Sequence, residues 1–419
     1  MSIRKWSRSE VITYVLLTLV YVASWIDING IFAELPQIVL TQPEGWRLGA
    51  HLGLAANFGN IAPLVLVLIK CFVKRKTLDP VPINYVVILI GMLACFLLIF
   101  FWSYTTIIGN ERRSTALLIL TFLLSILDCS SSVSFADYAN RFRKEFLGSF
   151  FLGECLTSLL PSVLALAQGN GEIYCQTIGN ETVSIYQTAR FPVSIYFLCL
   201  FLLLTISFTA FTTLQWTRIA HKAIQVTPET SSDVEIRELH SKSERMSKSV
   251  YLLMLIGCLY TSSILYGLMI SISTYVLMPY GQRIFYWGTV ISPWMMAIVW
   301  FLGSKQPLIK KPFLIILIAI GSILMSYVLY VAATSPCSPL VGSTAGSAII
   351  LTIWFLTYIA FGYPRLVIAN YVRSHSSNGM FWFGVNIQCG ALLGTVTAYL
   401  LVEVFGVFHE QAACEPILC

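Results

Sequence analysis

The chain has 419 residues, of which 57% are hydrophobic and 11% are charged, and its formal net charge at pH 7 is +6. A soluble domain is nearer to about 45–50% apolar and about 25% charged. This chain therefore has too little polar surface to cover a water-soluble globule, and lipid must be its solvent over much of its surface. The modest positive charge does not indicate nucleic-acid binding.

Eleven segments are long and apolar enough to cross a membrane. A helix needs about 20 apolar residues to cross a hydrocarbon core of roughly 30 Å, and lipid offers no hydrogen-bond partner to a backbone that is not helical. In chain order the predicted spans are 11–39, 50–69, 81–103, 115–135, 147–168, 192–214, 249–277, 284–303, 313–333, 346–368 and 380–404. The sequence therefore predicts an all-α membrane protein with about eleven spans.

The distribution of positive charge predicts the orientation of these spans. With a cytosolic N-terminus, 21 of the 26 Lys and Arg residues fall on the cytosolic side, a count that assigns Arg365, at the end of the tenth span, to the following loop together with Arg373. The outer side then holds the other five, which are Arg47, Arg112, Arg113, Arg190 and Arg283. Because loops rich in Lys and Arg stay in the cytosol, we expect a cytosolic N-terminus and an extracellular C-terminus.

Features of extracellular segments fall on the predicted outer side. The Asn180-Glu181-Thr182 sequon lies in the loop after 147–168, so we expect glycosylation at Asn180. Four cysteines also fall outside, where disulfides persist: Cys175, Cys337, Cys414 and Cys419. Four cysteines allow three pairings, of which we favour Cys337 with Cys414 and Cys175 with Cys419.

A polar stretch between the sixth and seventh spans divides the chain. Its mixed charges, serines and threonines are typical of a mobile linker. The predicted parts are a six-helix bundle (1–216), a cytosolic linker (217–248), a five-helix bundle (249–405) and an extracellular tail (406–419). Such a plan is common among secondary transporters.

Motifs for other kinds of chemistry are missing from the sequence. It contains no G-x-x-x-x-G-K-[ST] loop, no H-E-x-x-H and no C-x-x-C. We therefore expect no enzymatic activity, no ATP-driven transport, no metal site and no cofactor. A seven-helix receptor would need four fewer spans, although a cell-surface receptor remains an alternative.

Polar residues inside the spans are the candidate functional positions. A charge at the bilayer centre costs several kcal/mol, so it usually faces a cavity or a partner. Asp27, Asp128 and Glu154 are candidates either for proton binding or for structural pairing. Trp25 and Asn29 are four residues apart and share one helix face, where an aromatic ring beside an amide suits a flat, uncharged solute.

Two further spans carry informative spacings. In 249–277, Tyr260, Ser263 and Tyr266 are predicted to line a second polar face. In 380–404, Gly390 and Gly394 form a small-xxx-small pair that favours close helix packing. Structural explanations compete throughout, because Ser and Thr often bond to their own helix backbone and Asn and Gln often hold helices together.

Ordered blocks of sequence resemble the eukaryotic riboflavin transporter family. The first block comprises Ser24-Trp25, Asn29-Gly30-Ile31, Glu34-Leu35-Pro36 and Pro43-Glu44-Gly45-Trp46. Later blocks are Gly59-Asn60, Cys129–Phe135, Ser149–Gly153, Leu159–Pro161, Pro279–Gly281, Ser335–Gly342, Ile387-Gln388, Gly390, Leu392–Gly394 and the close pair Cys414 and Cys419. The resemblance spans nearly the whole chain apart from the central linker.

The resemblance implies a fold and a function. The fold is an eleven-helix plan related to the major-facilitator or equilibrative-nucleoside type. The function is facilitative uptake of riboflavin across the plasma membrane, without sodium or ATP. We expect it to work by alternating access, either as a uniporter or as a carrier influenced by protons. We expect a monomer, and the alternative within transport is a carrier for another flat neutral solute such as a nucleoside.

Riboflavin suits the polar residues inside the spans. Trp25 or a tyrosine would stack on its planar ring, and amides would pair with its imide, since they both donate and accept hydrogen bonds. Hydroxyl groups would meet its ribityl chain. The predicted substrate-binding residues are Trp25, Asn29, Glu34, Asn60, Ser131, Thr261, Tyr266, Tyr358 and Gln388.

Overall fold

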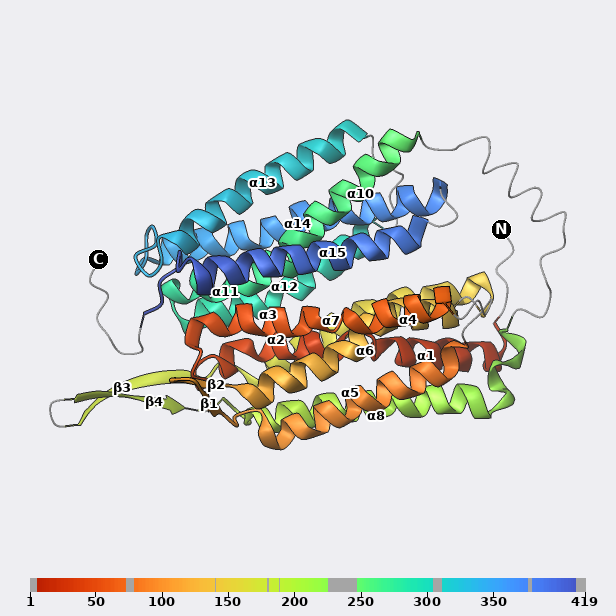
Figure 1. Cartoon of the computed structure of the whole chain (residues 1–419), viewed down its shortest axis with the longest axis horizontal. Coiled ribbons are helices and arrows are strands. Elements are labelled where there is room, and N and C mark those ends of the chain that lie inside the picture. Colours follow the sequence, from red (N-terminus) through yellow and green to blue (C-terminus); the bar gives the residue numbers. More distant parts are fainter. Residues whose placement is uncertain are drawn as a thin grey trace.

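Long helices run side by side along most of the chain in the computed structural model (Figure 1). The structure describes residues 6–72, 79–139, 141–178, 181–187, 189–224, 247–303, 311–375 and 379–411. Most of the predicted linker, together with Asn180, Cys414 and Cys419, lies outside these residues. The predicted glycosylation and disulfide pairing therefore stay predictions.

The first group of helices covers the N-terminal half of the chain. Its helices are α1 (Arg8–Val22), α2 (Ile26–Ile38), α3 (Leu48–Phe58), α4 (Ile61–Phe72), α5 (Pro80–Phe101), α6 (Thr115–Ala139), α7 (Leu147–Gln168) and α8 (Val193–Trp216). Short 3-10 turns lie between or after them: η1 (Gly45–Arg47), η2 (Lys144–Phe146) and η3 (Arg218–Lys222).

The second group covers the C-terminal half and lies beside the first (Figure 1). Its helices are α10 (Lys248–Ser262), α11 (Met269–Leu277), α12 (Gln282–Gly303), α13 (Lys311–Ala333), α14 (Thr344–His375) and α15 (Gly379–Tyr399). Two π-helical segments, η4 (Ser263–Leu268) and η6 (Leu400–Val404), continue α10 and α15, and the 3-10 turn η5 (Met278–Tyr280) follows α11.

The described helices agree with an all-α membrane protein. Eight of them are long and apolar enough to cross a membrane, or nine spans if α1 and α2, which meet at 54°, count as one. The two remaining predicted spans, 50–69 and 284–303, coincide with α3 plus α4 and with α12. The number eleven therefore stays a prediction, although a helix or a broken helix occupies each predicted range.

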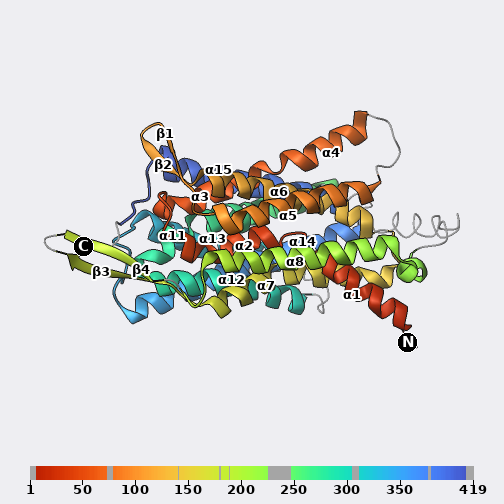
Figure 2. The ribbon, with the colours of Figure 1, turned by 90° about the horizontal axis from the view of Figure 1, so that it is seen from below.

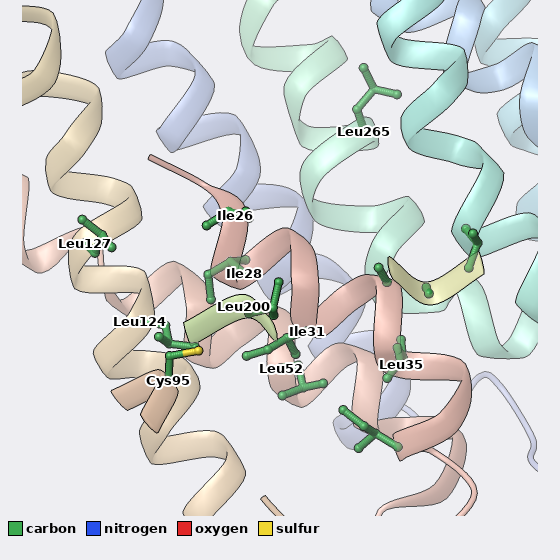
Figure 3. Close-up of a cluster of buried hydrophobic side chains, with 14 of the residues drawn as sticks. Ile26, Ile28, Ile31, Leu35, Leu52, Cys95, Leu124, Leu127, Leu200 and Leu265 are labelled. Atoms are coloured by element: carbon green, nitrogen blue, oxygen red, sulfur yellow. The ribbon is translucent and has the colours of Figure 1, made fainter. Parts of the chain in front are cut away.

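Apolar side chains cover both the inside and the outside of the bundle. Figure 3 shows a buried cluster around α2, formed by Ile26, Ile28, Ile31, Leu35, Leu52, Cys95, Leu124, Leu127, Leu200 and Leu265. On the outside, large side chains such as Leu93 of α5 and Ile323 of α13 are exposed. Exposed apolar surface on this scale is expected only where lipid covers it.

Three predicted spans are interrupted, and each interruption carries polar residues. The first breaks between α1 and α2, where Trp25 has a non-helical backbone. The second breaks at Gly59 and Asn60, where a side chain at Gly59 would collide with the backbone of Ser125. The third interrupted span, 249–277, contains the π-helical segment η4. Interrupted helices in membrane carriers commonly line a substrate path.

The predicted close packing at Gly390 and Gly394 is confirmed. A Cβ on Gly390 would collide with the carbonyl of Leu259, and one on Gly394 would collide with that of Ser263. Gly267 of η4 faces Gly394 from the opposite side. Glycines thus bring the backbones of α15 and the α10–η4 segment into direct contact.

Two β-hairpins, which the sequence reading did not predict, project from one end of the bundle. They pair β1 (Thr106–Ile108) with β2 (Glu111–Arg113) and β3 (Glu172–Ile178) with β4 (Glu181–Gln187), both antiparallel. Figures 1 and 2 show α1 beginning at the opposite end. Both hairpins lie in loops predicted to be extracellular, and Cys175 of β3 is disulfide-bonded, as is Cys337.

Candidate functional site

The two helix groups are joined by hydrogen bonds near the hairpins. The Trp46 N–H donates to the Glu410 carboxylate at 3.1 Å, and the Trp46 carbonyl accepts from the Thr274 hydroxyl at 2.6 Å. The Asn57 amide of α3 donates to the Thr395 hydroxyl of α15 at 3.0 Å. Main-chain and side-chain groups of both halves therefore meet there.

Ion pairs cross the same boundary. Arg47 lies 3.7 Å from Glu403 and 3.9 Å from Glu410. The His51 ring lies 3.4 Å from Glu403, and its Nε2 accepts a hydrogen bond from the Arg113 guanidinium at 3.1 Å. We call Trp46, Arg47, His51, Asn57, Thr274, Thr395, Glu403 and Glu410 the hairpin-end contact. It holds the two helix groups together next to the hairpins.

The α7 and α12 helices add a second line of contacts across the boundary. The Ser162 hydroxyl donates to the Val290 carbonyl at 2.6 Å and accepts from the Trp294 indole at 2.6 Å. The Tyr286 hydroxyl donates to the Ala165 carbonyl at 3.0 Å. This line stabilises the part of α7 that leads up to the β3–β4 hairpin.

Further along α7 lies a cluster of polar groups around Asn29. The Asn29 amide of α2 lies 3.3 Å from the Thr157 hydroxyl and 3.2 Å from the Ser158 hydroxyl, both on α7. Glu154 lies one helical turn before Ser158. It is about 20 Å along α7 from Gln168. Two of the predicted functional residues, Asn29 and Glu154, therefore lie close together.

Arg365 was predicted to lie in a cytosolic loop, and that prediction is wrong. It lies within α14, is 9% exposed, and its guanidinium carbon is 4.6 Å from the centre of the Tyr266 ring. A guanidinium nitrogen also donates to the Tyr266 hydroxyl. The charge count assigned every Lys and Arg to a loop, whereas α14 continues through Pro364 to His375.

Arg365 is a candidate functional residue that the sequence reading missed. It is the only Lys or Arg inside any of the eleven predicted spans. A basic residue inside a span points to a partner or a functional site, so this signal was present in the sequence. Glu154, on the other helix group, is close enough to Arg365 to interact with it electrostatically.

The predicted polar face of Tyr260, Ser263 and Tyr266 is also wrong. Tyr260 is exposed, and its hydroxyl lies 2.8 Å from that of Ser322 on α13. Tyr266 instead contacts Arg365 of α14. The π-helical geometry of η4 changes the angle between successive side chains, so the regular helical spacing does not apply across it.

Asp27 and Asp128 face each other inside the first helix group. Both are fully buried, and they are close enough to form a carboxyl–carboxyl hydrogen bond when one of them carries a proton. The backbone N–H of Ile28 donates to Asp27 at 3.0 Å. Of the two roles left open by the sequence, this geometry agrees with a structural pair that holds α2 against α6.

Glu34 lies near the hairpin end of α2. Its carboxylate accepts from the Gln168 amide at 2.8 Å. One turn further on, Gln37 donates to the Gly169 carbonyl at 2.9 Å and accepts from the Tyr186 hydroxyl at 2.9 Å. Burial and the nearby Glu34 carboxylate raise the pKa of Tyr186 to about 12, so its hydroxyl stays a donor to Gln37. These bonds attach α2 to the β3–β4 hairpin.

Two of the predicted substrate-binding residues, Ser131 and Thr261, already have hydrogen-bond partners within their own helix group. The Ser131 hydroxyl is within hydrogen-bond distance of the Ser24 and Asp128 carbonyls, and Thr261 bonds to the Gly257 and Cys258 carbonyls. Both side chains are buried. Their hydroxyl protons are engaged in structural bonds.

The remaining predicted substrate-binding residues keep polar or aromatic groups available for contact with a substrate. Trp25, Tyr358 and Gln388 are each half-buried, and the Tyr358 ring packs edge-on against Trp354. Among the described residues, neither amide atom of Asn60 has a hydrogen-bond partner, although both are buried. A buried amide without a partner is costly. Within the same described part of the chain, no group of three His, Cys, Asp or Glu could hold a metal ion.

Comparison with known proteins identifies the family. A family model described as solute carrier family 52, riboflavin transporter, matches residues 9–410. The chain is 28% identical to riboflavin transporter member 3-B of Danio rerio, over 96% of this chain and 98% of the relative. It is 30% identical to riboflavin transporter member 2 of Homo sapiens, over 96% of this chain and 97% of the relative.

Solved structures identify the fold. The chain superposes on the nucleoside transporter NupG with a TM-score of 0.51 at 11% identity, covering 94% of this chain and 91% of that one. It superposes on a D-xylose-proton symporter with a TM-score of 0.55 at 12% identity, covering 94% and 89%. The fold is that of a major-facilitator-type transporter, and the protein is a member of the solute carrier family 52 of riboflavin transporters.

Proposed function

We propose that this protein carries riboflavin across the plasma membrane by facilitative alternating access. The proposal rests chiefly on the family match over residues 9–410. The relatives in Danio rerio and Homo sapiens, which are named riboflavin transporters, are covered over nearly their whole length. Transport needs neither ATP nor sodium, and the N-terminus is cytosolic while the C-terminus is extracellular.

The polar groups that lie deep in the protein support this substrate. Riboflavin is flat and uncharged, with a planar ring, an imide edge and a ribityl chain of hydroxyl groups. Aromatic rings at Trp25, Tyr266 and Tyr358 offer surfaces on which a planar ring stacks. Amides at Asn29, Asn60 and Gln388 offer both donors and acceptors. Glu34, Ser131 and Thr261 then support the surrounding helices.

Uptake of labelled riboflavin tests the proposal. Cells expressing this chain should accumulate riboflavin above matched cells without it, equally with sodium or choline in the medium. Excess unlabelled riboflavin should compete, and excess nucleosides should not. Failure to accumulate riboflavin, with the chain present at the cell surface, would contradict the proposal, and competition by nucleosides would favour a nucleoside carrier.

Labelling of a C-terminal tag tests the orientation. The tag should react with an impermeant reagent on intact cells, because an odd number of spans from a cytosolic N-terminus ends outside. Reaction only after permeabilisation would overturn the orientation and leave the family assignment intact. Loss of a glycan on Asn180→Gln would support the same orientation.

A further inference from the structure

His51 of α3 is neutral in this structure. Its Nδ1 lies 3.0 Å from the Arg47 carbonyl, and its Nε2 lies 3.1 Å from a guanidinium nitrogen of Arg113. A carbonyl only accepts hydrogen bonds and a guanidinium only donates them. The ring proton is therefore on Nδ1, and the Nε2 lone pair accepts from Arg113.

The same ring nitrogen faces a carboxylate of the other helix group. Nε2 of His51 lies 3.4 Å from Oε1 of Glu403, which belongs to η6. This oxygen is buried and has no hydrogen-bond partner among the described residues. A buried acceptor without a donor is unfavourable. A proton on Nε2 would supply the missing donor directly across the boundary between the two helix groups.

The charges around His51 divide by sign between the two helix groups. The positive neighbours, Arg47 of η1 and Arg113 of β2, belong to the same group as His51. They stay beside the ring whether or not the groups separate. The carboxylates that reach His51 and Arg47 from the other group are Glu403 and Glu410. Separation of the two groups therefore takes negative charge away from His51 and leaves the positive charge behind.

Other titratable groups on the elements around α3 do not alter this division. They are Glu34 of α2, Glu44 before η1, Glu111 of β2, Asp128 of α6, Tyr275 of α11 and Tyr399 of α15. The four carboxyl groups lie in the same helix group as His51. The two tyrosines lie in the other group, and a phenol is neutral near pH 7.

We propose that His51 binds a proton that closes the hairpin end of the carrier. When the proton binds, Nε2 gives up the bond from Arg113 and donates to Glu403. The bond from Arg113 is lost in the closed and the open arrangement alike, whereas the bond to Glu403 forms only in the closed one. The closed arrangement therefore binds the proton more tightly, and by linkage the proton favours closure.

The direction of the pH effect follows from this linkage. Histidine is the side chain that ordinarily changes its charge between about pH 5 and pH 8. Acid medium therefore favours the closed hairpin end, and alkaline medium favours its opening. This inference rests on the alternating access of the proposed function, but not on the identity of the substrate.

Cysteine labelling on intact cells tests the inference without any substrate. Ser271 of α11 lies one helical turn from Thr274, whose hydroxyl donates to Trp46, and a Cβ on Gly53 of α3 would meet the Ser271 hydroxyl. The thiol in Ser271→Cys should therefore react with an impermeant maleimide only when the groups separate. The rate is measured at about pH 5.5 and about pH 8, on either side of the ordinary titration of histidine, in a background without other free cysteines.

His51→Gln in the same background is the reference, because the reactivity of the thiol itself changes with pH equally in both chains. The rate with His51 divided by the rate with His51→Gln should be roughly two- to fivefold lower at the acid pH, as expected for a partly exposed ion pair. When both chains also carry Glu403→Gln, this ratio should not depend on pH, because the carboxylate that favours the proton is gone.

His409→Gln is the matched control. His409 is an exposed histidine at the same end of the bundle, and its backbone carbonyl accepts from Ser335. This variant should keep the full pH dependence. Arg113→Gln should move the dependence to higher pH, because the guanidinium no longer opposes the proton on Nε2.

The outcomes separate the inference from the proposed function. A rate ratio that is the same at both pH values, or one that keeps its pH dependence with Glu403→Gln, makes the inference wrong. Riboflavin uptake is measured separately, so the proposed function then stands. If Ser271→Cys never reacts on cells although the denatured protein does, the hairpin end does not open. The inference then fails together with the alternating access of the proposed function, whereas absence of riboflavin uptake alone contradicts only the proposed substrate.

Discussion

The hairpin-end contact and the region around Arg365 differ in the kind of partner that each charged group has. In the hairpin-end contact, Arg47 has two carboxylate partners, Glu403 and Glu410, and Trp46 bonds through both its N–H and its carbonyl. In the other region, Arg365 bonds to the Tyr266 hydroxyl, and no carboxylate of the described residues forms an ion pair with it. A carrier that must open at alternate ends needs one closed contact and one site that awaits a substrate. We therefore propose that the hairpin-end contact closes one end of the carrier and that Arg365 lies on the substrate path.

Arg365→Ala should produce the largest effect. Removing the guanidinium takes away a charged hydrogen-bond donor and the partner of the Tyr266 hydroxyl, so we expect riboflavin uptake to fall by roughly tenfold or more. Uptake should be normalised to surface-labelled protein. Equal uptake by Arg365→Ala and the unmodified chain would remove Arg365 from the site and erase the contrast between the two regions.

Gly394→Val should produce the next largest effect. The added side chain collides with the Ser263 carbonyl, which forces α15 away from η4, the segment that carries Tyr266. Overpacking of this kind costs about 1–3 kcal/mol, visible as a lower thermal unfolding temperature in detergent. Gly384→Ala is the matched control, because a Cβ there meets no atom within 4 Å. Equal destabilisation by both changes would argue against the close contact.

Glu403→Gln should have a smaller effect, confined to the hairpin-end contact. It weakens the pair with Arg47, whose side chain is partly exposed, so the pair contributes only about 0–1 kcal/mol. Ser271 is a buried residue of α11 that packs against Gly53 of α3, across the boundary between the two helix groups. We expect faster reaction of an impermeant maleimide with Ser271→Cys, by roughly a few-fold, in a background without other free cysteines. Slower labelling would contradict the assignment of this contact as a closure.

Asp79→Ala should have the smallest effect and serves as a reference outside both regions. Hydrogen bonds from the Val81 N–H and from Arg141 keep the pKa of Asp79 below its ordinary value of 3.8. Because the folded-state pKa is lowered, this stabilisation is complete above pH 3.8 and is lost as the pH falls through the folded-state value.

Thermal unfolding of Asp79→Ala at two pH values tests the direction of this pH dependence of stability. The variant should be slightly less stable than the unmodified chain at pH 7, and the difference should shrink below pH 3.8. Asp79→Asn keeps a capping oxygen at the start of α5 and should lose less. A difference that grows in acid would contradict the direction of the pKa shift.

The sequence predicted the spans well because length and hydropathy decide them. It missed the breaks at Trp25 and Asn60, since local backbone geometry depends on neighbours such as Ser125 that are distant in sequence. The hairpins were missed because the loops were judged only by length. The pairing of Asn29 with α7 and the contact of Arg365 with Tyr266 join residues far apart in the chain, which a single sequence does not reveal.

The attachment of the β3–β4 hairpin to α2 has a practical consequence. Gln37 bonds both to the Gly169 carbonyl, just before β3, and to the Tyr186 hydroxyl of β4, so the hairpin is tied to α2. The hairpin extends beyond the helices (Figure 1), where a large reagent has access to it. An antibody fragment raised against this hairpin would thus hold α2 without entering the membrane, and it would serve as a handle for fixing one conformation in structural work.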